Sequence, residues 1–186
     1  MNIVKTRFSG LMIFEPRVFE DSRGSFFESY SERILKENKI DIRFVQDNQS
    51  SSVYGVIRGL HYQLPPYAQT KFVRVLEGVV LDVVVDIRKG SPTYGETFSI
   101  ELSAENKKQL FVPAGFAHGF SVLSESAQLF YKCDAFYNKE SEGGISYNDP
   151  ALMIDWKIPE GKAILSDNDK DLPTLKDCKN TFEFKG

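Results

Sequence analysis

The sequence predicts an all-β domain, an antiparallel sandwich or barrel of the jelly-roll type. Apolar residues recur in short runs with a period of two, and Gly, Pro, Asn and Asp residues interrupt these runs about every ten residues. Only one stretch has the longer spacing of a helix. Many short strands with few helices are typical of antiparallel architectures that close on themselves.

The clearest strand signal is "VVLDVVVDIR", residues 79–88. Every second residue from Leu81 to Ile87 is apolar, whereas Asp82 and Asp86 belong to the opposite face of the strand. The "KGSP" that follows predicts a turn. The pattern gives the two aspartates no role: they either balance cations in a pocket or face solvent.

The other elements follow the same logic. Residues 31–40, "SERILKENKI", predict the one helix with Ser31 as its N-cap, and a second short turn is expected after Ser166. We expect one domain over residues 1–186, with the segment from about residue 176 onward as a candidate loose tail. Further strands are expected at 10–14, 26–30, 43–49, 55–63, 71–77, 96–102, 109–112, 118–123, 128–137 and 145–147.

Composition excludes several classes of protein. A chain of 186 residues that is 41% hydrophobic and 26% charged is typical of a soluble globular domain. A net charge of −3 argues against a nucleic-acid surface, and no apolar run approaches the roughly 20 residues of a membrane helix. The N-terminus lacks the features of a signal peptide. We therefore expect a cytoplasmic protein without a nucleic-acid or membrane partner.

One histidine pattern resembles a metal site. Gly-x5-His over residues 55–61 and Pro-x-Gly-x-x-His over residues 113–118 match the spacing of metal-binding cupins. The second histidine of that pattern is here Gln63, and the place of the acidic ligand is taken by Lys71. An ammonium group does not coordinate a metal at neutral pH, so the sequence predicts no metal site.

His61 is then a candidate for acid–base chemistry, because imidazole titrates close to neutral pH. Arg58 lies three positions earlier, so the two side chains share a face only if Gly59 kinks or bulges the strand. The alternative is a hydrogen-bonded histidine at the rim of the barrel. This segment alone leaves both interpretations open.

Several segments together resemble the dTDP-4-dehydrorhamnose 3,5-epimerase family over about residues 8–175. They include "FEDSRGSFFES", "RGLHYQ", "VPAGFAHGF", "YNKESEGGI" and "ILSDNDKDLP", which occur in this order. The resemblance implies a cupin-type jelly-roll barrel with a few short peripheral helices, usually a homodimer, that needs no metal or organic cofactor. It also implies a dTDP-linked 4-keto-6-deoxy sugar as substrate, inverted at C3 and C5 on the route to dTDP-L-rhamnose and its surface polysaccharides.

The resemblance implies four catalytic residues. His61 matches the base and Asp169 the carboxylate that orients it. Lys71 matches the group that stabilises an enolate oxygen, and Tyr131 matches the acid that returns a proton from the other face. Tyr137 is an alternative acid, because it lies six residues further on and shares the face of Tyr131 if the strand is regular.

A second set of positions is implied to hold the substrate. Arginine suits a diphosphate because its planar group makes charge-assisted, often bidentate contacts. Gln46 and Asn48 are suited to reading the edge of a base, and Phe26 to packing on the base or sugar, with strand exchange from a partner subunit as one arrangement. The positions are Arg23, Phe26, Glu28, Gln46, Asn48, Arg58, His118, Tyr137 and Glu142.

The chain departs from the family pattern before the predicted carboxylate. Where the family tends to have Ser-x-Lys-Asp, residues 166–169 are Ser-Asp-Asn-Asp, so Asn168 replaces a cation. Three other functions stay open: an epimerase acting on one carbon or on another 4-keto sugar nucleotide, a non-catalytic sugar-nucleotide-binding cupin, and a metal-dependent cupin enzyme, which Gln63 and Lys71 disfavour.

Overall fold

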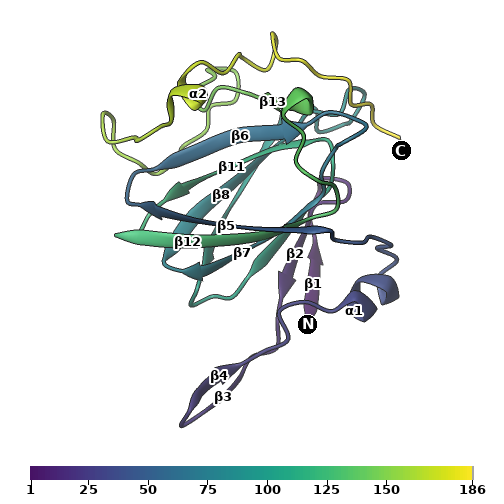
Figure 1. The fold of residues 1–186 in the computed structure, drawn as a ribbon, viewed down its shortest axis with the longest axis vertical. Helices are drawn as coiled ribbons and strands as arrows, with labels where there is room; N and C mark the ends of the chain where they lie inside the picture. The colour runs from purple at the N-terminus through teal and green to yellow at the C-terminus, as the bar shows by residue number, and fades with distance from the viewer. Residues whose placement is uncertain (186) are drawn as a thin grey trace.

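The computed structural model describes residues 1–185 as two antiparallel sheets packed face to face (Figure 1). One sheet has the order β1-β2-β10-β7-β12-β5 and the other β13-β6-β11-β8-β9, which confirms the predicted all-β fold. The strands are β1 (Asn2–Lys5), β2 (Met12–Glu15), β3 (Phe19–Asp21), β4 (Gly24–Phe26), β5 (Gln46–Val53), β6 (Ile57–Gln63), β7 (Lys71–Glu77), β8 (Val79–Asp86), β9 (Thr97–Ser103), β10 (Gln109–Val112), β11 (Phe116–Val122), β12 (Ser126–Cys133) and β13 (Glu142–Gly144).

Strand β8 contributes to two apolar layers. Val80 and Val84 face the space between the sheets, where they join the main core. Val83 and Val85 face the other way and pack under the C-terminal segment, which runs over this sheet in Figure 1. Both faces of the strand are therefore buried, and the Asp82 and Asp86 side chains point into the interior instead of into solvent.

The expected loose tail is packed against the five-stranded sheet. Phe182 makes an edge-to-face contact with Tyr62, with ring centroids 6.3 Å apart. The Tyr62 hydroxyl donates a hydrogen bond to the main-chain carbonyl of Lys179, and the Asn180 side chain donates to the carbonyl of Ile87. These contacts attach the segment after residue 176 to β6 and to the end of β8.

Several predicted boundaries were wrong, each where a strand loses its neighbour. The strand expected at 128–137 ends at Cys133, because its partners β5 and β7 reach only that far. The strand expected at 26–30 ends at Phe26, the last residue paired in the β3–β4 hairpin. Strands β1, β3 and β13 were not predicted, and the strand expected at 145–147 lies just beyond the end of β13.

The helices are short. Helix α1 (Glu32–Glu37) begins after Ser31 as predicted, although the Ser31 side chain makes no capping hydrogen bond. Helix α2 (Asp167–Lys170) is capped by Ser166, whose hydroxyl accepts from the Asp169 main-chain NH, and a short 3₁₀ turn, η1, spans Lys139–Ser141. In residues 1–185 no helix is long and apolar enough to cross a membrane.

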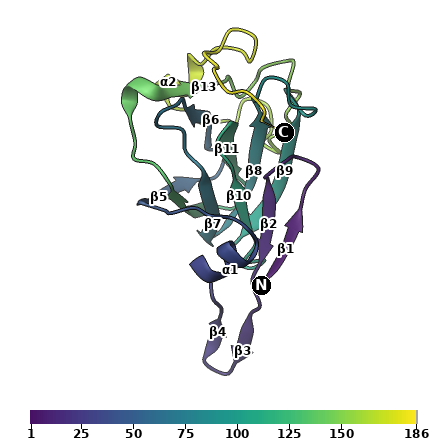
Figure 2. The same ribbon diagram turned by 90° about the vertical axis from the view of Figure 1, so that its right-hand side faces the viewer.

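The β3–β4 hairpin projects away from the two sheets. It lies at the opposite end of the molecule from α2, as both ribbon views show (Figures 1 and 2). Its paired residues Phe19 and Phe26 are 52% and 73% exposed. Two aromatic side chains are therefore largely exposed on this projecting hairpin, where Arg17 lies over the Phe19 ring at 4.8 Å.

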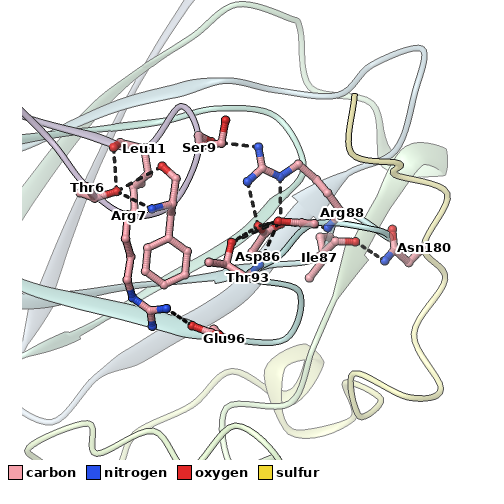
Figure 3. A network of polar contacts seen from close by, with 12 residues as sticks. Thr6, Arg7, Ser9, Leu11, Asp86, Ile87, Arg88, Thr93, Glu96 and Asn180 are labelled. Atoms are coloured by element: carbon pink, nitrogen blue, oxygen red, sulfur yellow. Dashed lines mark hydrogen bonds and ion pairs between the residues drawn. The ribbon is translucent and has the colours of Figure 1, made fainter. Parts of the chain in front are cut away.

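A polar network surrounds Asp86 where β8 ends (Figure 3). The fully buried carboxylate accepts hydrogen bonds from Arg88, Ser91 and Thr93, with donor–acceptor distances of 2.6 to 2.8 Å. Burial alone would raise the pKa of Asp86, but these hydrogen bonds hold it below its ordinary value. Arg88 also donates to the carbonyl of Ser9, so the network joins the loop after β8 to the N-terminal turn.

Candidate active site

A cavity of about 550 Å³ opens between the two sheets, beside β13 and α2. Strand β6 contributes His61, and α2 contributes Asp169. The other sheet contributes Lys71 from β7 and Tyr131 from β12. All four side chains expected to carry the chemistry therefore line one cavity.

A bulge in β6 brings Arg58 and His61 to the same side. His61 pairs with His118, and Arg58 pairs with Phe120. Between these two pairs β6 contains one residue more than β11, which is a β-bulge. Gly59 has a φ of +122°, and a Cβ atom there would lie 2.6 Å from the Cα of the facing glycine on β11. Both Arg58 and His61 consequently line the cavity.

His61 and Asp169 form a close pair. The distance from His61 Nε2 to Asp169 Oδ1 is 2.6 Å, and the carboxylate is 4% exposed. Burial would raise the pKa of Asp169, but its hydrogen bond and charge interaction with His61 hold the pKa below its ordinary value. Asp169 is therefore an ionised partner for the ring, and it leaves Nδ1 as the nitrogen free to exchange a proton.

His118 belongs to a second, deeper pair. Its Nε2 lies 2.9 and 3.0 Å from the two carboxylate oxygens of Asp82, and the two side chains are 6% and 0% exposed. The pairing gives Asp82 a partner that the sequence did not identify. The alternation of β8 could have shown that Asp82 faces inward, because it shares that face with Val84 of the core, but it could not identify the partner.

Lys71 and Tyr131 lie side by side on the opposite sheet. The Lys71 ammonium is 5.9 Å from the centroid of the Tyr131 ring. Burial lowers the pKa of Lys71, an effect that nearby carboxylates including Asp82 oppose. Burial raises the pKa of Tyr131, so its hydroxyl keeps its proton at neutral pH. The cavity thus has an imidazole on one wall and a phenol with an ammonium group on the other.

Gln46 and Asn48 lie on β5 with side chains on one face, and the Gln46 amide donates to Asn48 Oδ1 over 3.0 Å. Ser50, two residues further along the same face, lines the cavity. The two amides therefore extend one wall of the cavity along β5, although neither lines the cavity itself.

Arg23, Phe26 and Glu28 are not brought to this chain's own cavity. Arg23 is paired with Asp21, at 2.5 Å, within the projecting hairpin. Phe26 lies on the same hairpin, and Glu28 follows it in the chain. Within one chain, these three residues are separated from the other expected substrate contacts.

Tyr137 does not share the face of Tyr131. The prediction assumed a regular strand, but β12 ends at Cys133. Tyr137 is 56% exposed, and its hydroxyl donates to Glu142 over 3.0 Å. Glu142 itself lines the cavity, so Tyr137 belongs to the rim and lies outside the cavity where a proton would be delivered.

The residues at the cupin ligand positions do not suit a metal. The Gln63 amide is 4% exposed; it donates to the carbonyl of Tyr67 and accepts from the main-chain NH of Asn138, so it is committed to holding two turns. Within residues 1–185, no three His, Cys, Asp or Glu side chains are grouped so that they could hold a metal ion.

Besides Ser50, four further polar residues line the cavity although the sequence analysis assigned them no contact there: Lys139, Ser166, Asn168 and Asp171. Asn168 occupies the position at which the family pattern has a cation. Lys170, the next residue but one, is not a substitute within the cavity, because its ammonium pairs with Asp167 at 2.8 Å. Helix α2 consequently presents the Asn168 amide and the Asp169 carboxylate to the cavity, and Asp171, directly after the helix, adds a second carboxylate.

Known proteins resemble this chain in sequence and in fold. The sequence profile of the dTDP-4-dehydrorhamnose 3,5-epimerase family matches residues 5–177. The Shigella flexneri protein of that name is 52% identical over 172 residues, which are 91% of this chain and 93% of the relative.

Two solved structures have the same fold. The Elizabethkingia anophelis dTDP-4-dehydrorhamnose 3,5-epimerase is 55% identical, with a TM-score of 0.91 over 95% of this chain and 97% of the other. A Legionella pneumophila 3,5-epimerase solved in complex with dTDP-4-keto-L-rhamnose is 49% identical, with a TM-score of 0.90 over 94% and 93%. The predicted cupin-type fold is confirmed, and the chain belongs to the dTDP-4-dehydrorhamnose 3,5-epimerase family.

Proposed function

We propose that this protein epimerises dTDP-4-dehydro-6-deoxy-D-glucose at C3 and C5 to give dTDP-4-dehydro-L-rhamnose, a step of dTDP-L-rhamnose biosynthesis. The observation that carries the proposal is the placement of His61 with Asp169 on one wall of the cavity and of Tyr131 with Lys71 on the other. Inversion at carbon needs a base and an acid on opposite faces of the sugar, and this cavity supplies both.

The chemistry follows from the C4 ketone of the substrate. A ketone acidifies the protons on both neighbouring carbons, so removal of either proton gives an enolate without help from a metal or organic cofactor. His61 removes the proton, and Asp169 stabilises the imidazolium that forms. Lys71 stabilises the negative enolate oxygen, and Tyr131 delivers a proton from the other wall. The same groups then act on the second carbon.

A non-catalytic sugar-nucleotide-binding protein is the alternative from another functional class. Binding alone needs no imidazole–carboxylate pair facing a protonated phenol. Burying the charged groups of Lys71 and Asp169 lowers the stability of the protein, and a binding protein would gain nothing from it. The complete set of four groups therefore favours an enzyme.

We infer that the active form is a homodimer in which the β3–β4 hairpin of one subunit completes the site of the other. The hairpin is remote from its own α2, yet it exposes Phe26 and carries Arg23, both expected to hold substrate (Figures 1 and 2). Mixing Arg23→Glu with His61→Ala subunits tests this. An equimolar mixture that exchanges subunits should recover about a quarter of the normal sites, because about half of its dimers are mixed and one of the two sites in each combines the unaltered hairpin with the unaltered His61. Recovery of no activity on mixing would exclude a shared site.

The proposed reaction is tested by proton NMR of the 4-keto sugar nucleotide incubated with the protein in deuterium oxide. Deuterium incorporation with inversion at both C3 and C5 is the expected result, and it should persist after exhaustive chelation. Inversion at C3 alone would identify a one-carbon epimerase, and binding without any exchange would identify a binding protein. A cytoplasmic location stays a prediction from the sequence.

A further inference from the structure

Lys139 lies on the wall of the cavity without a role in the chemistry described above. It opens the η1 turn just before β13, and its side chain is exposed at the cavity surface. No carboxylate of residues 1–185 forms an ion pair with it. An unpaired cation facing a cavity is available to a negatively charged ligand.

The turn that carries Lys139 is held in place. The Asn138 side chain accepts a hydrogen bond from the Ser141 main-chain NH at 3.0 Å. The Asn138 NH in turn donates to the buried amide of Gln63 at 2.8 Å, at the end of β6. Strand β6 also carries Arg58 and His61, so the position of Lys139 is fixed relative to both.

The neighbouring lysines are already engaged. Lys170 on α2 pairs with Asp167 at 2.8 Å, and Lys132 on β12 pairs with Asp47 at 3.0 Å. Neither lysine lines the cavity. Arg58 does line it and has a single hydrogen bond, from Nε to the Ser52 hydroxyl at 3.1 Å. Apart from Lys71 beside the phenol, Arg58 and Lys139 are the cations that this cavity offers to a ligand.

We propose that Lys139 binds the diphosphate of the sugar nucleotide, together with Arg58. This inference rests on the proposed function, because it takes the substrate to be a nucleoside diphosphate sugar. The sugar must lie between His61 and Tyr131, so its charged diphosphate has to lie away from these two residues. There a flexible ammonium group can follow the phosphate oxygens as a point charge. Because the diphosphate does not change during epimerisation, Lys139 contributes to affinity and not to the chemical step.

The test compares Lys139→Gln with Lys170→Gln, which removes the same charge from a lysine that does not line the cavity and is paired with Asp167. Isothermal titration measures the affinity of each variant for dTDP, inorganic pyrophosphate and thymidine. Lys139→Gln should weaken dTDP and pyrophosphate about five- to twentyfold, as expected for one charge-assisted hydrogen bond at a partly exposed site, and should leave thymidine binding unchanged. In turnover, KM should rise by the same factor while kcat stays within about twofold. Lys139→Arg should restore most of the affinity.

Equal dTDP affinity in the Lys139→Gln and Lys170→Gln variants would overturn the inference while leaving the proposed function intact. A loss of thymidine affinity as large as the loss for dTDP would also overturn it, because the residue would then support the base or the turn. If the unaltered protein binds dTDP but inverts neither carbon, the proposed function fails, and the diphosphate contact is still decided by the same titrations.

Discussion

The cavity and the Asp86 network both bury charged side chains, but they use them differently. In the network, Asp86 accepts from three side chains (Figure 3). Its main partner Arg88 also packs over the Phe116 ring at 4.4 Å. Asp82 is equally buried and lies only four residues away on β8, behind the cavity wall. Among the described residues its one side-chain partner is His118, which lines the cavity. Lys71 has no ion pair within residues 1–185.

The difference teaches how to separate structural from functional charges in this fold. A buried charge whose hydrogen bonds are all satisfied by its own loop stabilises that loop and has no capacity left for a ligand. A buried charge with unfilled capacity costs stability unless a ligand completes it. Substitutions in the cavity should therefore change turnover more than stability, and substitutions in the network should do the reverse.

The largest effect should come from the His61–Asp169 pair. His61→Ala should lower kcat by about 10⁴-fold, since it removes the base, and Asp169→Asn should cost orders of magnitude because the ring loses its orienting partner. The double variant should be scarcely slower than His61→Ala alone, because the two residues share one role. Steady-state kinetics measures all three. Losses that multiply in the double variant would show that Asp169 acts independently.

The next effect should be on stability. Asp86→Ala should lower the free energy of unfolding by about 3–5 kcal/mol, because it leaves the buried Arg88 group without its partner, while kcat of the folded protein changes little. Asp82→Asn is the matched variant on the same strand, and it should mainly lower kcat. Urea unfolding with parallel kinetics separates the two effects. Equal losses of stability would erase the distinction between the two regions.

Asp86 should also determine how the stability of the protein changes at acid pH. The folded-state pKa of Asp86 lies below the ordinary value of 3.8, so its contribution is complete above pH 3.8 and is lost as the pH falls through the lowered pKa. Asp86→Asn should therefore flatten the fall in stability below about pH 4.

Substitution of Tyr131 and of Tyr137 should have smaller effects on turnover, and the two effects should differ. Tyr131→Phe should lower kcat about 10²-fold, because it removes the proton donor on the far wall of the cavity. Tyr137→Phe should change kcat less than about fivefold and act mainly on KM, because its hydroxyl contacts Glu142 at the rim. Kinetics of both variants checks this, and the reverse order would transfer the acid role to Tyr137.

The smallest effect is a shift in pH dependence. Lys71 stabilises the enolate only as an ammonium ion, and burial places its pKa below the ordinary 10.5. Turnover should consequently fall as the pH rises through a value below 10.5. Glu142 opposes the effect of burial, so Glu142→Gln should move this fall to still lower pH. A kcat profile that is unchanged by Glu142→Gln would show that another group titrates.

Much of this arrangement could be predicted from the sequence, and the rest depends on contacts between distant segments. Alternation located β7 and β8, and the resemblance to the epimerase family pointed to Asp169 as the partner of His61, more than a hundred residues away. The true end of β12 could not be predicted, because it depends on where β5 and β7 begin.

The Asp82–His118 pair also depends on the register of neighbouring strands, which local pattern does not determine. Lys139 was not predicted, because in the sequence a single lysine in a turn cannot be distinguished from a solvated surface lysine. Only the structure shows that it lines the cavity. Sequence reasoning thus succeeded where the signal is local or carried by a motif, and failed where sheet pairing decides.

The central claim is that His61 and Tyr131 act on opposite faces of the same carbon, and isotope exchange tests it most directly. In deuterium oxide, His61→Ala should show neither exchange nor inversion of the 4-keto sugar nucleotide, because no enolate forms. Tyr131→Phe should still form the enolate beside Lys71, and His61 should return a deuteron to the face it came from. That variant should therefore incorporate deuterium with retained configuration and give little inverted product. Exchange that persists in His61→Ala, or normal inversion in Tyr131→Phe, would contradict the account.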